Sequence, residues 1–212
     1  MNLILYYKVF IAVCFFGRLK HFDRKYFLNS FGPKHTYNFF YSGDNEPEEL
    51  LAEFQRVYTP IAINNEKLSY DVDFGIYPNN KTCPANINNM TRHLLNKKRV
   101  FALLEEHCKT TQTSYDLVVS CRLDLSMDAY TPELPLENTV YIPDGNDHTG
   151  MNDQFAMGDL QTMKQYMNIY DNCLYLLENK ISVPHPENLH LYNLLHCKIN
   201  IKRIKLPQNI IR

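Results

Sequence analysis

The chain has 212 residues, with 22 Lys+Arg against 23 Asp+Glu and a formal net charge of −1. This balance excludes a strongly basic nucleic-acid binder, and 45% apolar residues are enough to build a core in a chain of this length. Only 7 glycines occur, and neither a glycine-rich dinucleotide fingerprint nor a P-loop is present. We therefore expect a single domain, 1–212.

The first predicted element is a buried strand at residues 9–16. These residues form a continuous apolar run, rich in β-branched and aromatic side chains and ended by Gly17. Lys8 interrupts the apolar start, and neither a basic segment nor a small-residue cleavage site accompanies it, so a secretory signal is not expected. The run is also short for a membrane span, and we expect none.

Strands and helices alternate along the rest of the chain, which is typical of an α/β domain with a largely parallel sheet. Asp159 has the character of a helix N-cap, and Pro186 suits a first helical turn. In chain order we expect a strand at 36–41, a helix at 47–58, a strand at 60–63, a loop at 64–87, a helix at 90–108, strands at 115–121 and 139–142, a short strand after 154, helices at 160–177 and 186–196, and a strand at 199–206.

The six cysteines are scattered, and no Cys-x-x-Cys pair occurs. Disulfide frameworks are typical of shorter chains with denser cysteines. We therefore expect free thiols and a reducing, cytoplasmic location.

Polar residues follow several predicted strands where ligands of parallel sheets bind, beyond the carboxyl ends. These ends carry Gly17-Arg18, Asp44 and Arg122-Leu123-Asp124. Glycine lets a ligand approach the backbone, arginine offers planar donors to phosphate, and a carboxylate is a hard oxygen ligand for Mg²⁺ or Mn²⁺. The sequence predicts a site for a metal-bound diphosphate here, with a plain Arg–Asp surface pair as the alternative.

A literal Asp-x-Asp pair, the usual metal signature of nucleotide-sugar transferases, occurs at Asp71 and Asp73. A polar stretch precedes this pair, and no predicted strand leads into it to fix its position. We therefore expect a solvated loop there.

Two further segments carry candidate site residues. Asn152, Asp153 and Gln154 precede a short apolar strand, where they could bind sugar hydroxyls or only form an Asx-turn. The polar face of the helix at 90–108 carries Arg92, which could reach the same edge or be merely solvated. His185-Pro186-Glu187, with His190 nearby, could complete a metal shell, although Glu187 at a helix start is also favoured by the helix dipole.

These motifs, in this order, resemble glycosyltransferases of the GT-A fold from large DNA viruses and bacteria. The likeness is greatest to chlorovirus glycosyltransferase domains that help glycosylate the major capsid protein, and it covers about residues 9–206. It lies in Phe16-Gly17-Arg18, Tyr115 to Asp124, Tyr141-Ile142-Pro143, Asn152 to Gly158, and His185-Pro186-Glu187.

The resemblance implies a three-layer α/β/α sandwich with a mostly parallel central sheet, cut from a longer multidomain protein. It implies metal-dependent transfer of a hexose or deoxyhexose (glucose, galactose or rhamnose type) from a UDP-sugar to a glycan or glycoprotein hydroxyl, with retention of configuration, in capsid glycosylation.

The resemblance also implies residue roles. Mn²⁺ or Mg²⁺ would bind Asp124, and Arg122 stands where the family has its first Asp. Asp153 and Gln154 would be the catalytic residues: Asp153 is the best base if the enzyme inverts, and either would stabilise a cationic sugar if it retains. The expected donor-binding residues are Gly17, Arg18, Asp44, Arg92, Arg122 and Asp124.

Two alternatives stay open. A sugar-1-phosphate nucleotidyltransferase would usually carry a glycine-rich loop and a lysine after its first strand, and this chain has Phe16-Gly17-Arg18-Leu19 instead. A catalytically silent nucleotide-sugar or carbohydrate-binding domain is favoured by the missing first carboxylate. We expect the domain to be monomeric and to bind no nucleic acid.

Overall fold

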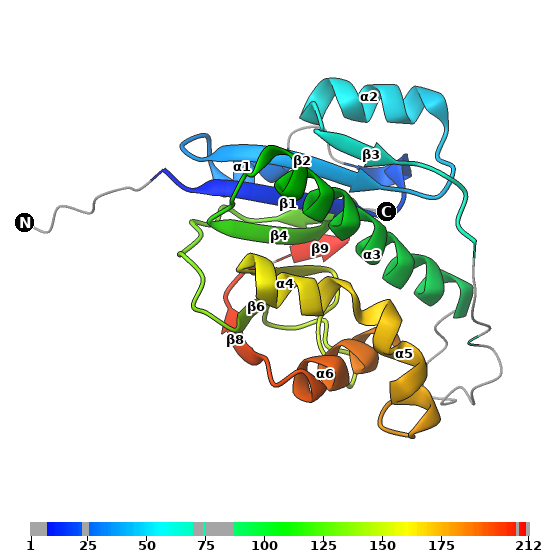
Figure 1. The fold of residues 1–212 in the computed structure, drawn as a ribbon. Coiled ribbons are helices and arrows are strands. Elements are labelled where there is room, and N and C mark those ends of the chain that lie inside the picture. The colour runs from blue at the N-terminus through cyan, green and yellow to red at the C-terminus, as the bar shows by residue number, and fades with distance from the viewer. Residues whose placement is uncertain (1–7, 23–25, 70–73, 75–86, 207, 211–212) are drawn as a thin grey trace, which may run out of the picture.

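The computed structural model describes residues 8–22, 26–69, 74, 87–206 and 208–210. Its main sheet has seven strands in the order β3-β2-β1-β4-β7-β6-β8 (Figure 1). Pairing is parallel except along β7, which is antiparallel to both of its neighbours. The strands are β1 (Phe10–Phe16), β2 (Thr36–Ser42), β3 (Ala62–Asn64), β4 (Leu117–Arg122), β6 (Thr139–Pro143), β7 (Phe155–Gly158) and β8 (Asn200–Ile204).

Helices cover both faces of the sheet because the central strands are apolar on both sides. Alternate residues of β1 point to opposite faces, as the period of a strand requires. One face packs against η1 (Leu19–His21), α1 (Tyr26–Phe31) and α2 (Glu48–Tyr58). The other packs against α3 (Ile87–Thr111), α4 (Leu160–Met167) and α6 (Pro186–His196), and Figure 1 shows α3 and α4 in front of the sheet. The predicted α/β class with a mostly parallel sheet is confirmed.

The strand order reverses between β1 and β4. From β1 the chain steps outward to β2 and β3, and α3 then leads back to β4 on the other side of β1. The register places Arg122 beside Phe16, and Phe16 beside Ser42. In sheets of this kind the crevice at such a reversal, beyond the carboxyl ends, is where ligands bind.

The predicted helix at 160–177 is wrong in one respect, since the chain forms two helices, α4 and α5 (Ile169–Glu178), that meet at Asn168. Asn168 closes α4 by donating its backbone N–H to Lys164, and its own carbonyl then accepts from Asp171 in the first turn of α5. Asparagine favours such terminal positions because its side chain competes with helical hydrogen bonds. Asp159 caps α4 as predicted, because its Oδ1 accepts from the Thr162 N–H at 2.8 Å.

A small second sheet was not predicted. It pairs β5 (Leu125–Met127) with β9 (Gln208–Ile210) in antiparallel fashion. Strands of three residues are too short to show a period of two, so only the tertiary pairing defines them.

In the described ranges, no helix combines the length and apolar character needed to cross a bilayer. The five cysteines of these ranges (Cys14, Cys108, Cys121, Cys173 and Cys197) are all free thiols.

Candidate functional site

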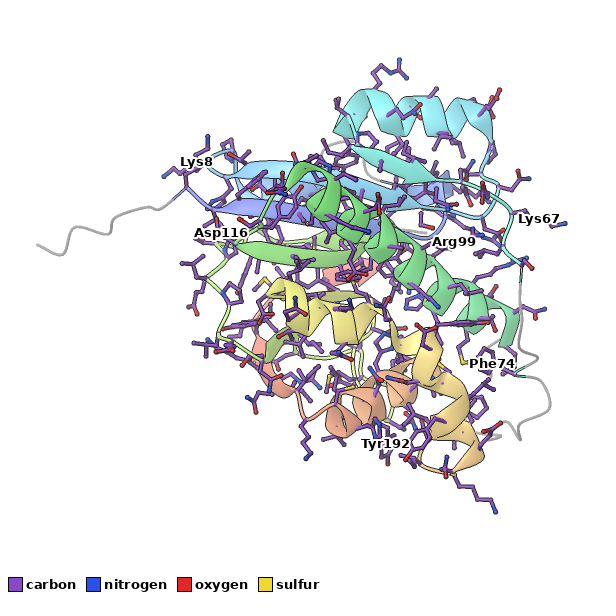
Figure 2. The ribbon with its side chains drawn as sticks, viewed as in Figure 1. Lys8, Lys67, Phe74, Arg99, Asp116 and Tyr192 are labelled. Carbon is purple, nitrogen blue, oxygen red and sulfur yellow. The ribbon has the colours of Figure 1, made fainter. Side chains whose placement is uncertain are left out.

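A cleft of about 830 Å³ opens at the strand reversal. The ends of β1, β2 and β4 and the N-terminal turns of α3 and α6 form its walls. Figure 2 shows Asp116, which precedes β4, at the opposite end of the strands from Arg99 and Lys67. Seven of the eight predicted site residues line the cleft: Gly17, Arg18, Asp44, Arg92, Arg122, Asp124 and Asp153.

The turn after β1 leaves backbone open to the cleft. Gly17 has φ = 101°, a conformation that favours glycine, and an added Cβ would meet no atom within 4 Å. Its carbonyl accepts a hydrogen bond from the Tyr41 hydroxyl at 2.8 Å, which fixes the turn to β2. Arg18 and Lys20 follow, both exposed, and neither forms an ion pair with a described residue. A ligand can therefore meet open backbone and two exposed cations at this corner.

Arg122 and Asp124 form a two-bond ion pair at the end of β4. Arg122 Nε donates to Asp124 Oδ1 at 3.0 Å, and Nη2 donates to Oδ2 at 2.6 Å. The Arg122 side chain is 27% exposed and the Asp124 side chain is 22% exposed, so the pair is partly buried and still reaches the cleft. Parallel bonds of this kind orient both groups.

Arg92 and Asp44 form a second pair across the cleft wall, with 3.1 Å between Arg92 Nε and Asp44 Oδ2. Asp44 Oδ1 also accepts from the Leu68 backbone N–H at 2.7 Å, so this carboxylate ties β2 to the segment that follows β3. Arg99, from the same helical face, instead donates to the Glu66 carbonyl at 2.8 Å and lies near Lys67 (Figure 2). Arg99 therefore holds that segment and does not line the cleft.

Asp153 is buried at the floor of the cleft, with 3% of its surface exposed. Its Oδ2 lies 3.0 Å from His93 Nε2, and its backbone carbonyl accepts from Lys97 Nζ at 2.6 Å. Burial works to raise the pKa of Asp153, but His93 and Lys97 outweigh it and lower that pKa below its usual range. The carboxylate therefore stays ionised even though it is shielded from water.

Lys97 is fully buried and has three polar partners. Besides the Asp153 carbonyl, Nζ lies 3.1 Å from the Tyr166 hydroxyl and 2.8 Å from His190 Nε2. His190 Nδ1 lies 2.8 Å from the Pro186 carbonyl, which can only accept, so Nε2 is left as an acceptor for Lys97. The three protons of the ammonium group thus match three acceptors, while burial lowers the pKa of Lys97 to about 7.

Sequence reasoning missed His93 and Lys97. Both lie on the apolar side of α3, at the spacing of Met90, Leu94 and Phe101. Titratable residues on a core-facing stripe need buried partners, and this was the signal available in the sequence. The residues predicted for the site, such as Arg92, lie instead on the opposite, polar face of the helix.

Gln154 is placed differently from Asp153. It is buried, it is absent from the lining of the cleft, and its Oε1 has no hydrogen-bond partner among the described residues. Asn152 Oδ1 accepts from the Gln154 backbone N–H at 3.0 Å, which is the Asx-turn considered as the structural alternative for this segment. Asn152 therefore shapes the turn, and Asp153 is the member that reaches the cleft.

The start of α6 closes one side of the floor. Glu187 Oε2 lies 2.9 Å from His185 Nδ1, and burial, followed by the nearby Asp153 charge, raises the pKa of Glu187 to about 8. A Cβ added to Gly150 would lie 2.3 Å from the Glu187 backbone carbon, so only glycine fits there. This close approach lets the Met151 N–H donate to the Glu187 carbonyl at 3.0 Å, which holds the segment before Asp153 against α6.

We predict that Glu187→Gln will change the pH dependence of stability. The unfolded chain loses the Glu187 proton near its ordinary pKa of 4.5, whereas the folded chain keeps that proton up to about pH 8. The folded state therefore binds more protons between these values, and the free energy of unfolding should fall as pH rises through this window. Urea titrations at several pH values should show a smaller fall in Glu187→Gln.

Glu137→Gln, at an exposed position, is the control and should keep the fall seen in the parent. Equal pH dependence in Glu187→Gln and the parent would contradict the assignment.

The residues around Asp124 do not fit a divalent cation. Mn²⁺ and Mg²⁺ need several oxygen ligands, and Arg122 bonds both oxygens of Asp124. Among the described residues, no group of three His, Cys, Asp or Glu side chains is placed to hold a metal. Asp71 and Asp73 lie outside the described residues. The metal requirement stays a prediction.

No protein-family model matches the chain, and a search of curated proteins found no match.

Proposed function

We propose that this chain is a glycosyltransferase of the GT-A fold, which transfers a hexose or deoxyhexose from a UDP-sugar to a hydroxyl of a glycan or glycoprotein. The observation that carries the proposal is the convergence of seven predicted residues on one cleft at the strand reversal. The resemblance to chlorovirus domains adds a capsid glycoprotein as the acceptor.

The roles of the side chains follow from their places. Arg18 and Arg122 provide donors for the diphosphate, and the open backbone at Gly17 allows close approach of the nucleotide. Asp153 faces the sugar from the floor. During transfer the bond from the anomeric carbon to the phosphate oxygen breaks and UDP departs. The acceptor oxygen forms a bond to the anomeric carbon, and its proton passes to the departing phosphate.

The ionised state of the Asp153 carboxylate supports transfer with retention of the sugar's configuration over transfer with inversion. A general base works best with a pKa near the working pH, whereas the pKa of Asp153 is lowered below its usual range. An ionised carboxylate is instead suited to stabilise the positive charge of an oxocarbenium-like transition state.

The second candidate is a catalytically silent nucleotide-sugar-binding domain. It is favoured by Arg122, which stands where the family has a carboxylate. The Arg122 side chain also donates hydrogen bonds to both carboxylate oxygens of Asp124. Turnover separates the two candidates, because a silent domain binds the donor without releasing UDP.

The test is a melting-temperature screen of UDP-, GDP-, CMP- and dTDP-sugars, followed by an assay for UDP release. At a hundredfold excess over Kd a ligand adds about 2.7 kcal/mol, which raises the melting temperature of a domain of this size by about 5–10 °C. We expect UDP-sugars to give the largest shift and to be turned over. Arg18→Ala should reduce the shift, and Lys202→Ala, which removes an exposed cation on β8, should not.

The absence of a shift with every nucleotide sugar would contradict the proposal. A shift without UDP release, under every metal and acceptor condition tried, would instead select the silent domain.

A further inference from the structure

Four carboxylates that line the cleft already have a partner in the structure. This is unfavourable for a metal ion, because each of these ligands would first have to give up that partner. The pairs are Asp44 with Arg92, Glu46 with the Leu19 backbone N–H, Asp124 with Arg122, and Asp153 with His93. The fifth acidic side chain, Glu187, keeps its proton up to about pH 8 and is then a poor metal ligand.

The tightest of these pairs stands where the resemblance implies the metal. A cation bound to Asp124 would have to displace a two-bonded guanidinium or lie beside its positive charge. The first loses two charge-assisted hydrogen bonds, and the second is repelled.

The Arg122 side chain has N–H groups that Asp124 does not use. A guanidinium carries five N–H groups, and Asp124 accepts two hydrogen bonds from it. No other described side chain bonds the group, which is partly exposed in the cleft. Its remaining N–H groups are free to bind a further anion.

The sheet brings a second source of positive charge to the same place. Arg122 pairs in register with Phe16, so Gly17 and Arg18 continue directly from the neighbouring strand end. Arg18 and Lys20 both line the cleft without an ion pair among the described residues.

We infer that Arg122, oriented by Asp124 and assisted by Arg18, binds the donor diphosphate in the position that a metal ion takes in related enzymes. Asp124 is then a positioning residue for the guanidinium and not a metal ligand. This inference rests on the proposed function, because it names the group that neutralises the leaving diphosphate.

The experiment measures UDP binding by calorimetry in Mn²⁺ and in EDTA, with the whole chain. The parent should bind UDP equally well in the two buffers. Arg122→Ala should weaken binding by about 10- to 100-fold in both, the loss expected for charge-assisted hydrogen bonds. Arg122→Asp, which supplies a second carboxylate two residues before Asp124, should bind weakly in EDTA and regain affinity in Mn²⁺.

Lys202→Ala is the matched control, because it removes one cation of β8 that forms an ion pair with Glu133. This variant should bind UDP like the parent. Circular dichroism melting checks that each variant folds. If Arg122→Ala does not fold, Arg122→Lys replaces it. Lysine keeps the positive charge without the planar guanidinium group, and it should still weaken UDP binding in both buffers.

UDP binding by the parent that EDTA abolishes would overturn the inference and leave the proposed function intact. Unchanged affinity of the folded Arg122 variants in EDTA would also overturn it. A parent that binds no nucleotide in either buffer would contradict the proposed function, and this inference with it.

Discussion

Replacing Asp153 by alanine should lower the rate of sugar transfer by about 10²- to 10³-fold, while the affinity for UDP stays close to that of the parent. The carboxylate lies at the floor of the cleft, where its ion-pair partner is His93 and not an arginine assigned to the diphosphate, and His93 and Lys97 keep it ionised. A fixed negative charge in a site shielded from water stabilises a cationic transition state more than the same charge in water would.

A purely structural role for Asp153 predicts a different result. Activity would then fall only with the folded fraction, and the melting temperature would account for the loss. UDP affinity, melting temperature and transfer rate should be measured on one sample of Asp153→Ala, and also on Asp153→Asn, which keeps the size of the side chain.

Asp159→Ala is the matched control for Asp153→Ala. It removes an aspartate whose carboxylate caps α4 through the Thr162 N–H, at a cost of about 1 kcal/mol in stability. Its folded fraction should transfer sugar at the rate of the parent. Transfer at near the parent rate in Asp153→Ala would remove this residue from the mechanism.

Lys97→Met should lower the free energy of unfolding by about 3–5 kcal/mol, the usual result of removing one member of a buried charged network. The change leaves the Asp153 carbonyl, the Tyr166 hydroxyl and His190 Nε2 without their shared donor. Methionine fills most of the space, so the cost is chiefly electrostatic. Urea denaturation at pH 7 measures it.

The difference between the parent and Lys97→Met should also depend on pH. Burial lowers the pKa of Lys97 to about 7 from its ordinary 10.5, so between these values the unfolded chain binds the proton and the folded chain does not. Stability conferred by Lys97 should therefore rise with pH above 7, by at most about 1.4 kcal/mol per unit. Urea denaturation of the parent and of Lys97→Met at pH 7 and pH 9 tests whether the difference in their free energies of unfolding grows with pH.

Lys98→Met is the control, because Lys98 is the next residue of α3 and forms an exposed pair with Asp171. It should change the free energy of unfolding by less than about 1 kcal/mol. If Lys97→Met were as stable as Lys98→Met, the buried network would not contribute to folding as described.

The cleft itself was largely predictable from the sequence. Apolar runs that end in polar residues predicted β1 and β4, and neighbouring parallel strands end at one edge, so Gly17, Arg18, Arg122 and Asp124 had to lie close together. Amphipathic spacing likewise predicted α3, although the structure extends it to Ile87–Thr111.

The chemistry behind the cleft was not predictable in the same way. Lys97 meets the Asp153 carbonyl and His190 across 56 and 93 residues of sequence, and no local pattern encodes such contacts. The pairing of Arg122 with Asp124 is local, yet the sequence was equally compatible with a metal ligand and an ion pair. Only the geometry showed that both carboxylate oxygens are bonded.

The α/β class and the residues at the carboxyl ends of the strands were predictable from the sequence, because periodicity and strand-end polarity are local properties. Tertiary structure alone decided the reversal between β1 and β4, the short β5–β9 pair and the burial of Lys97 beneath Asp153. These features depend on which distant segments pack together, and the pKa of each buried group depends on the charges that this packing brings near it.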